Sequence, residues 1–133
     1  MAGKYQPESG EVTPEEAHDR RRATFTEAMV NIYRNAKRQA AYDAKIFIGM
    51  VLDRGGYETA QYLIYSDQPS IGYTALYERG RLDLTVEALV IQPEWSDLFT
   101  DADRVRARDR LRAYGYVPAQ PVLEAQRDAD VRE

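Results

Sequence analysis

The sequence predicts an all-α protein, a compact bundle of about five to six short and medium helices with a longer N-terminal helix. Apolar residues recur every three or four positions, and helix-capping residues precede these stretches. Only residues 82–86, Leu-Asp-Leu-Thr-Val, alternate with the period of a strand. They have no second strand pattern to pair with, and a lone strand leaves its backbone groups unpaired, so a sheet is rejected.

Length and composition fit one domain. The chain has 133 residues, no cysteine and a formal net charge of −4, so one helical domain is expected over residues 13–116. The polar stretches 1–12 and 117–133 are expected to be mostly disordered. The apolar runs 44–52 and 85–91 are too short to cross a bilayer, and the start of the chain is too polar for a signal peptide. We therefore expect a cytoplasmic protein without disulfides or membrane contact.

The longest helix is expected near the N-terminus. Thr13 can cap it, Pro14 suits its first position, and Glu16 can complete a capping box. The apolar stripe that follows comprises Phe25, Met29, Ile32 and Ala36. This spacing is typical of an amphipathic helix with one buried face.

A second helix is expected after a break at Tyr42-Asp43. No Gly or Pro interrupts residues 15–47, but one helix of that length would be unusual. Asp43 can cap the second helix. Its apolar face is expected to comprise Ile46, Phe47, Met50 and Val51, and Arg54-Gly55-Gly56 can end it.

Two short helices should follow, at residues 58–65 and 71–79. The first is expected to bury either Ala60 and Leu63 or Leu63 and Ile64. Ser66-Asp67-Gln68-Pro69 is a turn, Ser70 can cap the second helix, and Gly80 can stop it.

A further helix should reach residue 91, and two residues can cap it. Thr85 would pair Leu84 with Leu89 as a hydrophobic staple, whereas Asp83 would place Glu87 near the positive helix end. The sequence does not decide between them.

The last helix is expected to begin at Thr100-Asp101-Ala102-Asp103, after a short turn that starts at Pro93. Its expected anchors are Val105, Leu111 and Tyr114, and Gly115 can stop it. An extra turn near residues 122–126 is a further expectation.

Residues 24–116 resemble a recurrent bacterial helical module. Its pattern comprises Ile-Tyr-x-x-Ala-Lys at 32–37, Tyr-x-Ala-x-x-Phe-x-x-Met at 42–50, Gly-Gly at 55–56, Ser-x-Gly-aromatic at 70–73 and Gly-Arg-Leu-Asp-Leu-Thr-Val-Glu-Ala-Leu-Val at 80–90. The chain departs from the pattern at Ala41, where the module has Gly, and at Tyr73, where it has Phe. The resemblance implies a helical fold and a bacterial source. The module has no assigned function, so it implies no catalytic residues.

Glu78, Asp83 and Glu87 are the candidate group for acid–base chemistry or a hard cation. Asp83 and Glu87 would lie one helical turn apart and face one point. Arg79 and Arg81 are adjacent in sequence and would neutralise these carboxylates. We therefore interpret the group as a structural ion-pair cluster at a helix junction.

No other pattern is typical of catalysis or metal binding. His18 is the only histidine and lacks a second soft ligand, and no serine has a histidine base within a motif. Gly55-Gly56 lacks the strand and the Lys-Ser/Thr of a phosphate loop. We expect no enzyme activity, no catalytic residue, no metal and no cofactor.

Two arginine runs are the candidate basic surfaces. Five arginines alternate through residues 104–112 with aspartates interleaved, which is typical of a solvated and paired helix face. Arg20-Arg21-Arg22 is the better candidate for an acidic partner. The overall acidic charge disfavours nucleic acid, because phosphate neutralisation requires a basic surplus.

The tyrosines are the most informative candidates for binding. The chain has ten, and half of them lie between Tyr57 and Tyr77. A small helical domain cannot bury all of them, and exposed tyrosines are favoured at protein interfaces. The interaction candidates are Tyr62, Tyr65, Tyr73, Tyr77, Arg81, Asp83 and Glu87.

The favoured hypothesis is a non-enzymatic interaction or regulatory module of a bacterial cell or mobile element, with a protein partner or self-association. The first alternative is a nucleic-acid-associated regulator with a helix–turn–helix-like pair at residues 71–79 and 85–91. That second helix is apolar and acidic where a recognition helix should be polar and basic. A small enzyme using the acidic cluster is the least supported alternative.

Overall fold

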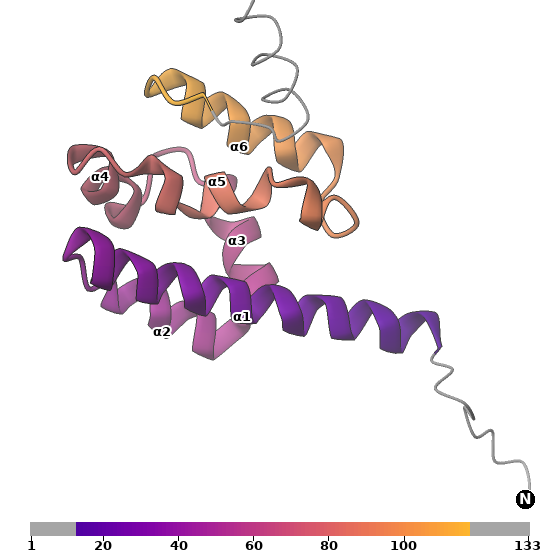
Figure 1. Cartoon of the computed structure of the whole chain (residues 1–133). Coiled ribbons are helices and arrows are strands. Elements are labelled where there is room, and N and C mark those ends of the chain that lie inside the picture. The colour runs from indigo at the N-terminus through magenta and orange to yellow at the C-terminus, as the bar shows by residue number, and fades with distance from the viewer. Residues whose placement is uncertain (1–12, 118–133) are drawn as a thin grey trace, which may run out of the picture.

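A computed structural model describes residues 13–117, and these residues form helices and no strand (Figure 1). In chain order the elements are α1 (Pro14–Ala40), α2 (Lys45–Arg54), α3 (Gly56–Ile64), α4 (Ile71–Glu78), the 3-10 helix η2 (Leu82–Leu84), α5 (Val86–Val90), the 3-10 helix η3 (Pro93–Trp95) and α6 (Asp101–Ala113). The predicted all-α bundle with a longer N-terminal helix is confirmed. The predicted arm at 1–12 and the tail beyond Val117, with its extra turn, lie outside the described residues.

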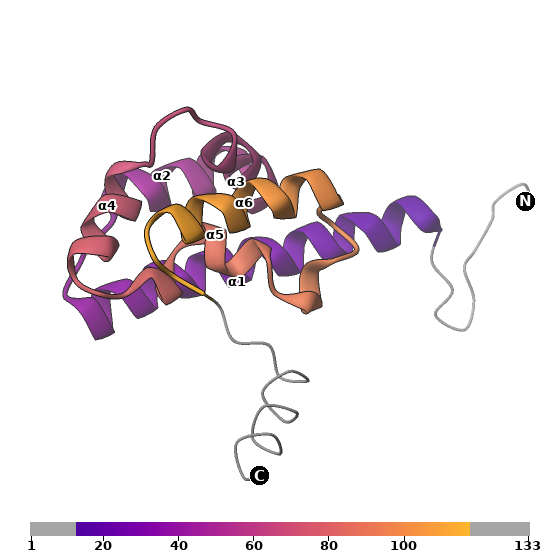
Figure 2. The same cartoon turned by 90° about the horizontal axis from the view of Figure 1, so that it is seen from above.

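The helices are stacked in layers. In Figure 1, α1 and α2 lie side by side, α4 and α5 lie above them, and α6 covers the side opposite α1. α3 connects the layers, since it contacts α1 and α2 as well as α5 and α6. Figure 2 shows α6 above the middle of α1, whose N-terminal end extends beyond the other helices. In the described part of the chain, no helix has both the length and the apolar character that a membrane crossing requires.

α1 begins as predicted. Thr13 Oγ1 accepts from the Glu16 amide and Glu16 Oε1 accepts from the Thr13 amide, both at 3.1 Å, and Pro14 takes the first helical position. The helix then runs for 27 residues. Phe25, Met29 and Ala36 of the predicted stripe are buried, while Ile32 is half-buried.

α1 ends at a left-handed residue. Ala41 has φ 54° and ψ 36°, and it is the only non-glycine residue with positive φ among residues 13–117. The predicted cap by Asp43 is wrong, because α2 is preceded by Ala44 and has no side-chain cap. The Asp43 carboxylate turns back toward α1 instead, where it accepts from the Tyr33 hydroxyl at 2.7 Å and lies 3.8 Å from Lys37 Nζ.

The glycine pair does more than end α2. Gly55 has φ 89°, which suits a residue without Cβ. Gly56 opens α3, two residues earlier than predicted, and its amide donates to Thr26 Oγ1 at 2.9 Å. A Cβ on Gly56 would lie 2.7 Å from Thr26 Cα, so glycine allows α3 to pack closely on α1. Ala60, Leu63 and Ile64 are all buried, so α3 buries the residues of both predicted pairs, Ala60 with Leu63 and Leu63 with Ile64.

Of the two possible caps for the helix before residue 91, Thr85 is the one that caps α5. Its Oγ1 accepts from the Ala88 amide at 3.2 Å and donates to the Leu82 carbonyl at 2.7 Å. Asp83 lies in η2 instead. Residues 82–86 therefore form η2 and the start of α5, which confirms the rejection of a strand. All five residues of α5 are buried.

An aromatic cluster joins α1 to the segment after α5. The ring of Phe25 contacts those of Trp95 and Phe99 edge-on, with centroids 5.1 Å apart in both pairs. Arg21 holds the same segment from outside, because its guanidinium binds the Asp97 carboxylate at 2.8 Å and lies 4.7 Å from the centre of the Trp95 ring.

α6 has the predicted start but a different buried face. Thr100 and Asp103 form a capping box, which supports the predicted helix start. Leu111 is fully buried as predicted, whereas Val105 and Tyr114 are 48% and 38% exposed. The buried positions are Asp103, Ala107 and Leu111, each four residues apart. Val105 is wrong as an anchor because it lies off this stripe.

Candidate binding pocket

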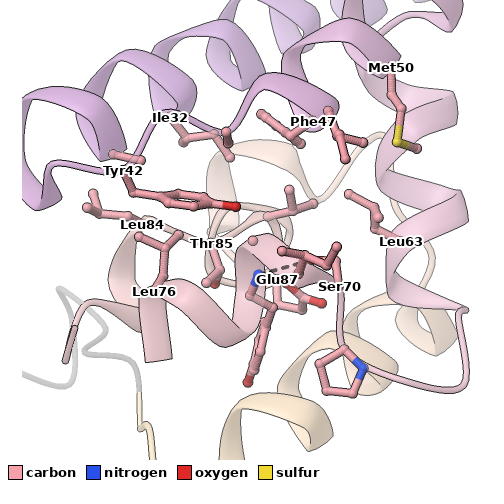
Figure 3. Close-up of a pocket in the computed structure, with 18 of the residues that line it drawn as sticks. Ile32, Tyr42, Phe47, Met50, Leu63, Ser70, Leu76, Leu84, Thr85 and Glu87 are labelled. Carbon is pink, nitrogen blue, oxygen red and sulfur yellow. Dashed lines mark hydrogen bonds between the residues drawn. The ribbon is translucent and has the colours of Figure 1, made fainter. Parts of the chain in front are cut away.

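An apolar pocket of about 580 Å³ lies between α1, α2 and α4, with the start of α5 at its base (Figure 3). Its apolar lining includes Ile32, Ala36, Phe47, Met50, Leu63, Leu76, Leu84 and Val86. Part of the wall consists of small or polar residues, namely Ser66, Gln68, Ser70 and Gly72. These side chains lack the apolar bulk that would fill the space between the helices.

Three large, exposed apolar or aromatic residues belong to the pocket lining and form its rim. Ile46 is 72% exposed, Ile71 is 73% exposed and Tyr62 is 56% exposed. The prediction that Ile46 belongs to the buried face of α2 is therefore wrong. Only Val51 of that face is fully buried, because α2 packs on α1 and α3 while Ile46 lies at the open end of the pocket.

Two polar residues of the lining act as helix caps. Ser70 Oγ accepts from the Tyr73 amide at 3.0 Å, and the Thr85 hydroxyl caps α5. The Tyr42 ring lies over Gly72, and its hydroxyl points into the pocket (Figure 3). The charged residues of the lining are Asp43, Lys45 and Glu87.

Glu87 is 3% exposed and forms an ion pair with Arg110 of α6. Arg110 Nη1 donates to Glu87 Oε2 at 3.2 Å and to the Leu63 carbonyl at 3.1 Å, and Nη2 donates to the Ser66 carbonyl. Burial raises the pKa of the Glu87 carboxyl, and the Arg110 guanidinium acts in the opposite direction. The Tyr73 hydroxyl completes the network by donating to the Arg110 backbone carbonyl at 3.1 Å.

Several α6 arginines bind backbone carbonyls. Arg106 Nε donates to Ile64 O at 2.9 Å, and Arg104 Nη2 donates to Ile91 O at 3.2 Å. These bonds satisfy carbonyls at the C-terminal ends of α3 and α5, which have no partner within their own helix. The prediction that this arginine run is a solvated, internally paired face is therefore wrong for Arg104, Arg106 and Arg110.

The predicted ion-pair cluster is divided between two places. Arg81 binds Asp83 at 2.9 Å on the surface and also donates to Gln39 Oε1 at 2.8 Å, while Arg79 donates to the Ala40 carbonyl at 3.0 Å. These arginines do connect the α4–η2 junction to the end of α1. Glu87 lies elsewhere, because the Thr85 cap starts a new helix between it and Asp83, so the two carboxylates do not face one point.

The predicted tyrosines lie in different environments. Tyr62, Tyr65 and Tyr77 are 56%, 44% and 45% exposed, and Tyr73 is 2% exposed. The rings of Tyr73 and Tyr77 both contact Tyr114 edge-on. Burial of Tyr73 raises the pKa of its hydroxyl and leaves no surface for a partner.

Tyr65 belongs to a separate polar network at the start of α6. Its hydroxyl donates to Asp103 Oδ1 at 2.6 Å, and Gln61 donates to Oδ2 at 2.9 Å. Burial opposes ionisation of Asp103, but the hydrogen bonds from Tyr65, Gln61 and Thr100 outweigh it and lower the pKa of this carboxyl. The network joins α3 to α6.

The other candidates take part in local contacts. His18 Nε2 accepts from Arg22 Nε at 3.1 Å, and Arg22 also lies over the Tyr57 ring at 4.0 Å. Within residues 13–117, no three His, Cys, Asp or Glu side chains are grouped so as to hold a metal ion.

Comparisons of the chain with protein-family models, curated proteins and solved structures find no match.

Sequence reasoning did not find the pocket or the role of Arg110. The residues that surround the pocket are spread from Ile32 to Glu87, and Arg110 lies 23 residues from its partner. The one available signal was Glu87 itself, an acidic residue within the apolar run Val86–Val90.

Proposed function

We propose that this protein is a non-enzymatic interaction module that receives an apolar part of a protein partner in the pocket between α1, α2 and α4. The observation that carries the proposal is the combination of an apolar pocket with the exposed side chains of Ile46, Tyr62 and Ile71 at its rim. Isolated exposed apolar residues are ordinary, but a group of them around a concave apolar surface is typical of an interaction site.

The physical reason is the burial of apolar surface. Covering an exposed isoleucine side chain contributes about 1.5–3 kcal/mol. A partner that covered Ile46 and Ile71 while filling the pocket would gain binding free energy from apolar surface buried both at the rim and inside the pocket. Of the tyrosines predicted for binding, Tyr62 lies on this rim, whereas buried Tyr73 supports the wall from inside.

Two features weigh against the alternatives. A helix–turn–helix pair would use α5 for recognition, and all five α5 residues are buried. An enzyme using the acidic cluster would need convergent carboxylates, but Asp83 pairs with Arg81 and Glu87 pairs with Arg110. Both carboxylates have structural partners.

Photocrosslinking in the native host tests the proposal. We would place p-benzoyl-phenylalanine at Ile46, at Ile71 or, as a control, at Leu52. Leu52 is 74% exposed on the same helix as Ile46 but does not line the pocket. We expect the same adduct from positions 46 and 71 and none from position 52. An adduct of twice the chain mass would identify self-association.

The captured partner would then be purified and titrated against two variants. Ile46→Asp should weaken binding at least tenfold, and Leu52→Asp should leave it unchanged. No adduct from positions 46 and 71, or equal weakening by both substitutions, would show that the pocket is not the interaction site.

A further inference from the structure

The pocket mouth has an exposed apolar side chain on each of two opposing sides. Figure 3 shows Phe47 of α2 on one side of the pocket and Ser70, which precedes α4, on the other. Ile46 comes directly before Phe47, and Ile71 comes directly after Ser70. Both isoleucines are exposed and belong to the lining. One molecule therefore presents both an apolar cavity and, beside it, side chains that are able to fill one.

Two of the three charged lining residues are engaged within the molecule. The Asp43 carboxylate accepts from the Tyr33 hydroxyl and lies 3.8 Å from Lys37 Nζ. Glu87 is buried in its ion pair with Arg110. Both carboxylates therefore have partners before anything covers the mouth.

Lys45 and Asp67 are opposite charges on the two sides of the mouth. Lys45 is the first residue of α2 and lines the pocket, while Asp67 lies between the lining residues Ser66 and Gln68. Both are exposed, and neither forms an ion pair with another residue of the described chain. The α2 side of the mouth thus has an unpaired positive charge, and the α4 side has an unpaired negative charge.

The size of the pocket requires more than one inserted side chain. Its volume of about 580 Å³ lies in the range of sites that enclose a whole small ligand. A protein that fills this space must therefore insert several side chains from one surface. The rim of a second copy offers three large ones within one patch, namely Ile46, Tyr62 and Ile71.

A two-fold axis brings these features together. In a two-fold interface the same patch contacts itself, so every contact between two different residues occurs twice. A 180° rotation about an axis that runs along the mouth, between α2 and α4, places α2 of one copy against the α4 side of the other. Lys45 of each copy then faces Asp67 of the other copy. An axis perpendicular to this one in the plane of the interface would place Lys45 against Lys45, which is repulsive.

We infer that the partner is a second copy of this chain, which packs on the pocket mouth about this two-fold axis. Each copy inserts its exposed rim side chains into the apolar pocket of the other, and Lys45 pairs with Asp67 across the interface at both edges. This inference rests on the proposed function, because it names the occupant of the same pocket.

Sedimentation of the purified full chain measures the self-association. We expect a monomer–dimer equilibrium in a concentration series from about 1 μM to about 1 mM. Ile71→Asp should weaken dimerisation at least tenfold, because it places a charge in an apolar site twice per dimer. Leu52→Asp is the matched control, since Leu52 is equally exposed but does not line the pocket, and it should leave dimerisation unchanged.

Charge reversal tests the direction of the axis. Lys45→Glu brings like charges together with Asp67, and Asp67→Lys brings like charges together with Lys45, so each variant alone should dimerise about tenfold more weakly. In an equimolar mixture the introduced glutamate of one variant faces the introduced lysine of the other, and the two unaltered residues also face each other. We therefore expect the mixture to form a heterodimer about tenfold tighter than either variant alone.

A strict monomer across the concentration series would overturn the inference. Equal weakening by Ile71→Asp and Leu52→Asp would overturn it as well, and so would a mixture that associates no better than the separate charge variants. The proposed function fails separately from the inference. A monomeric chain that still gives one adduct with a different protein from photocrosslinkers at positions 46 and 71 would retain the proposed function and refute the second copy.

Discussion

The amide of Gly56 donates a hydrogen bond to the Thr26 hydroxyl at 2.9 Å, at the point where α3 starts against the middle of α1. The bond requires close approach of the two backbones, and a Cβ on Gly56 would lie 2.7 Å from Thr26 Cα. Because Gly56 has no side chain, the first turn of α3 can pack directly against the backbone of α1 and form this hydrogen bond.

Gly56→Ala should lower the free energy of unfolding by about 2 kcal/mol or more, because the clash is with backbone and the helices must separate. The matched control is Gly49→Ala in α2, where an added Cβ meets nothing within 4 Å. That change should stabilise by about 0.5–1 kcal/mol through helix propensity. Urea denaturation measures both, and the same sign for the two variants would contradict the proposed role of Gly56.

Ala41→Gly should stabilise the protein. Ala41 has φ 54° at the end of α1, a conformation that costs a residue with Cβ about 1 kcal/mol. Glycine adopts it without strain. We expect a gain of about 0.5–1 kcal/mol in unfolding free energy, in contrast to a loss of about 1 kcal/mol for Ala23→Gly inside α1. A thermal denaturation series compares them, and a loss at both positions would argue against the left-handed conformation.

Removing one member of the Glu87–Arg110 pair should strongly destabilise the protein. Glu87→Leu leaves Arg110 buried without its carboxylate, and such losses cost about 3–5 kcal/mol. Arg110→Met should cost at least as much, because it also removes donors to the Leu63 and Ser66 carbonyls. The double variant should be more stable than the sum of the single effects predicts. Additive effects in a double-mutant cycle by urea denaturation would show that the pair is not coupled.

Asp103 should make stability depend on acidic pH. Its folded-state pKa lies below the ordinary value of 3.8, so its contribution is present above that pH and is lost as the pH falls through the lowered value. Asp103→Asn should therefore destabilise the protein more at pH 7 than at pH 2.5. Unfolding free energies at both pH values measure this, and an equal effect at both would contradict the lowered pKa.

Glu87 should make the free energy of unfolding depend on pH in the opposite direction to Asp103. Its folded-state pKa is raised above 4.5, so its contribution is present below that pH and is lost as the pH rises through the raised value. Wild-type stability relative to Glu87→Gln should therefore decline from pH 4 to pH 7. A rising difference over this interval would mean that Arg110 outweighs burial.

The local elements of the fold were determined by the sequence. Thr13, Ser70 and Thr100 cap helices as predicted, because a cap depends on residues only three positions away. The stop at Gly80 and the rejection of a strand at residues 82–86 depend on the same short-range logic. These interactions form within one helix and the residues next to it, so they do not require contact between helices.

Only the tertiary structure decided which faces are buried and which charges meet. Ile46 and Val105 were predicted to be buried and are exposed, because burial depends on where neighbouring helices lie. Asp43 accepts a hydrogen bond from the Tyr33 hydroxyl instead of capping α2, and Glu87 forms an ion pair with Arg110, which lies 23 residues away in the sequence. The pocket is a space between helices that no single segment encodes, since its walls come from residues brought together by the packing of α1, α2 and α4.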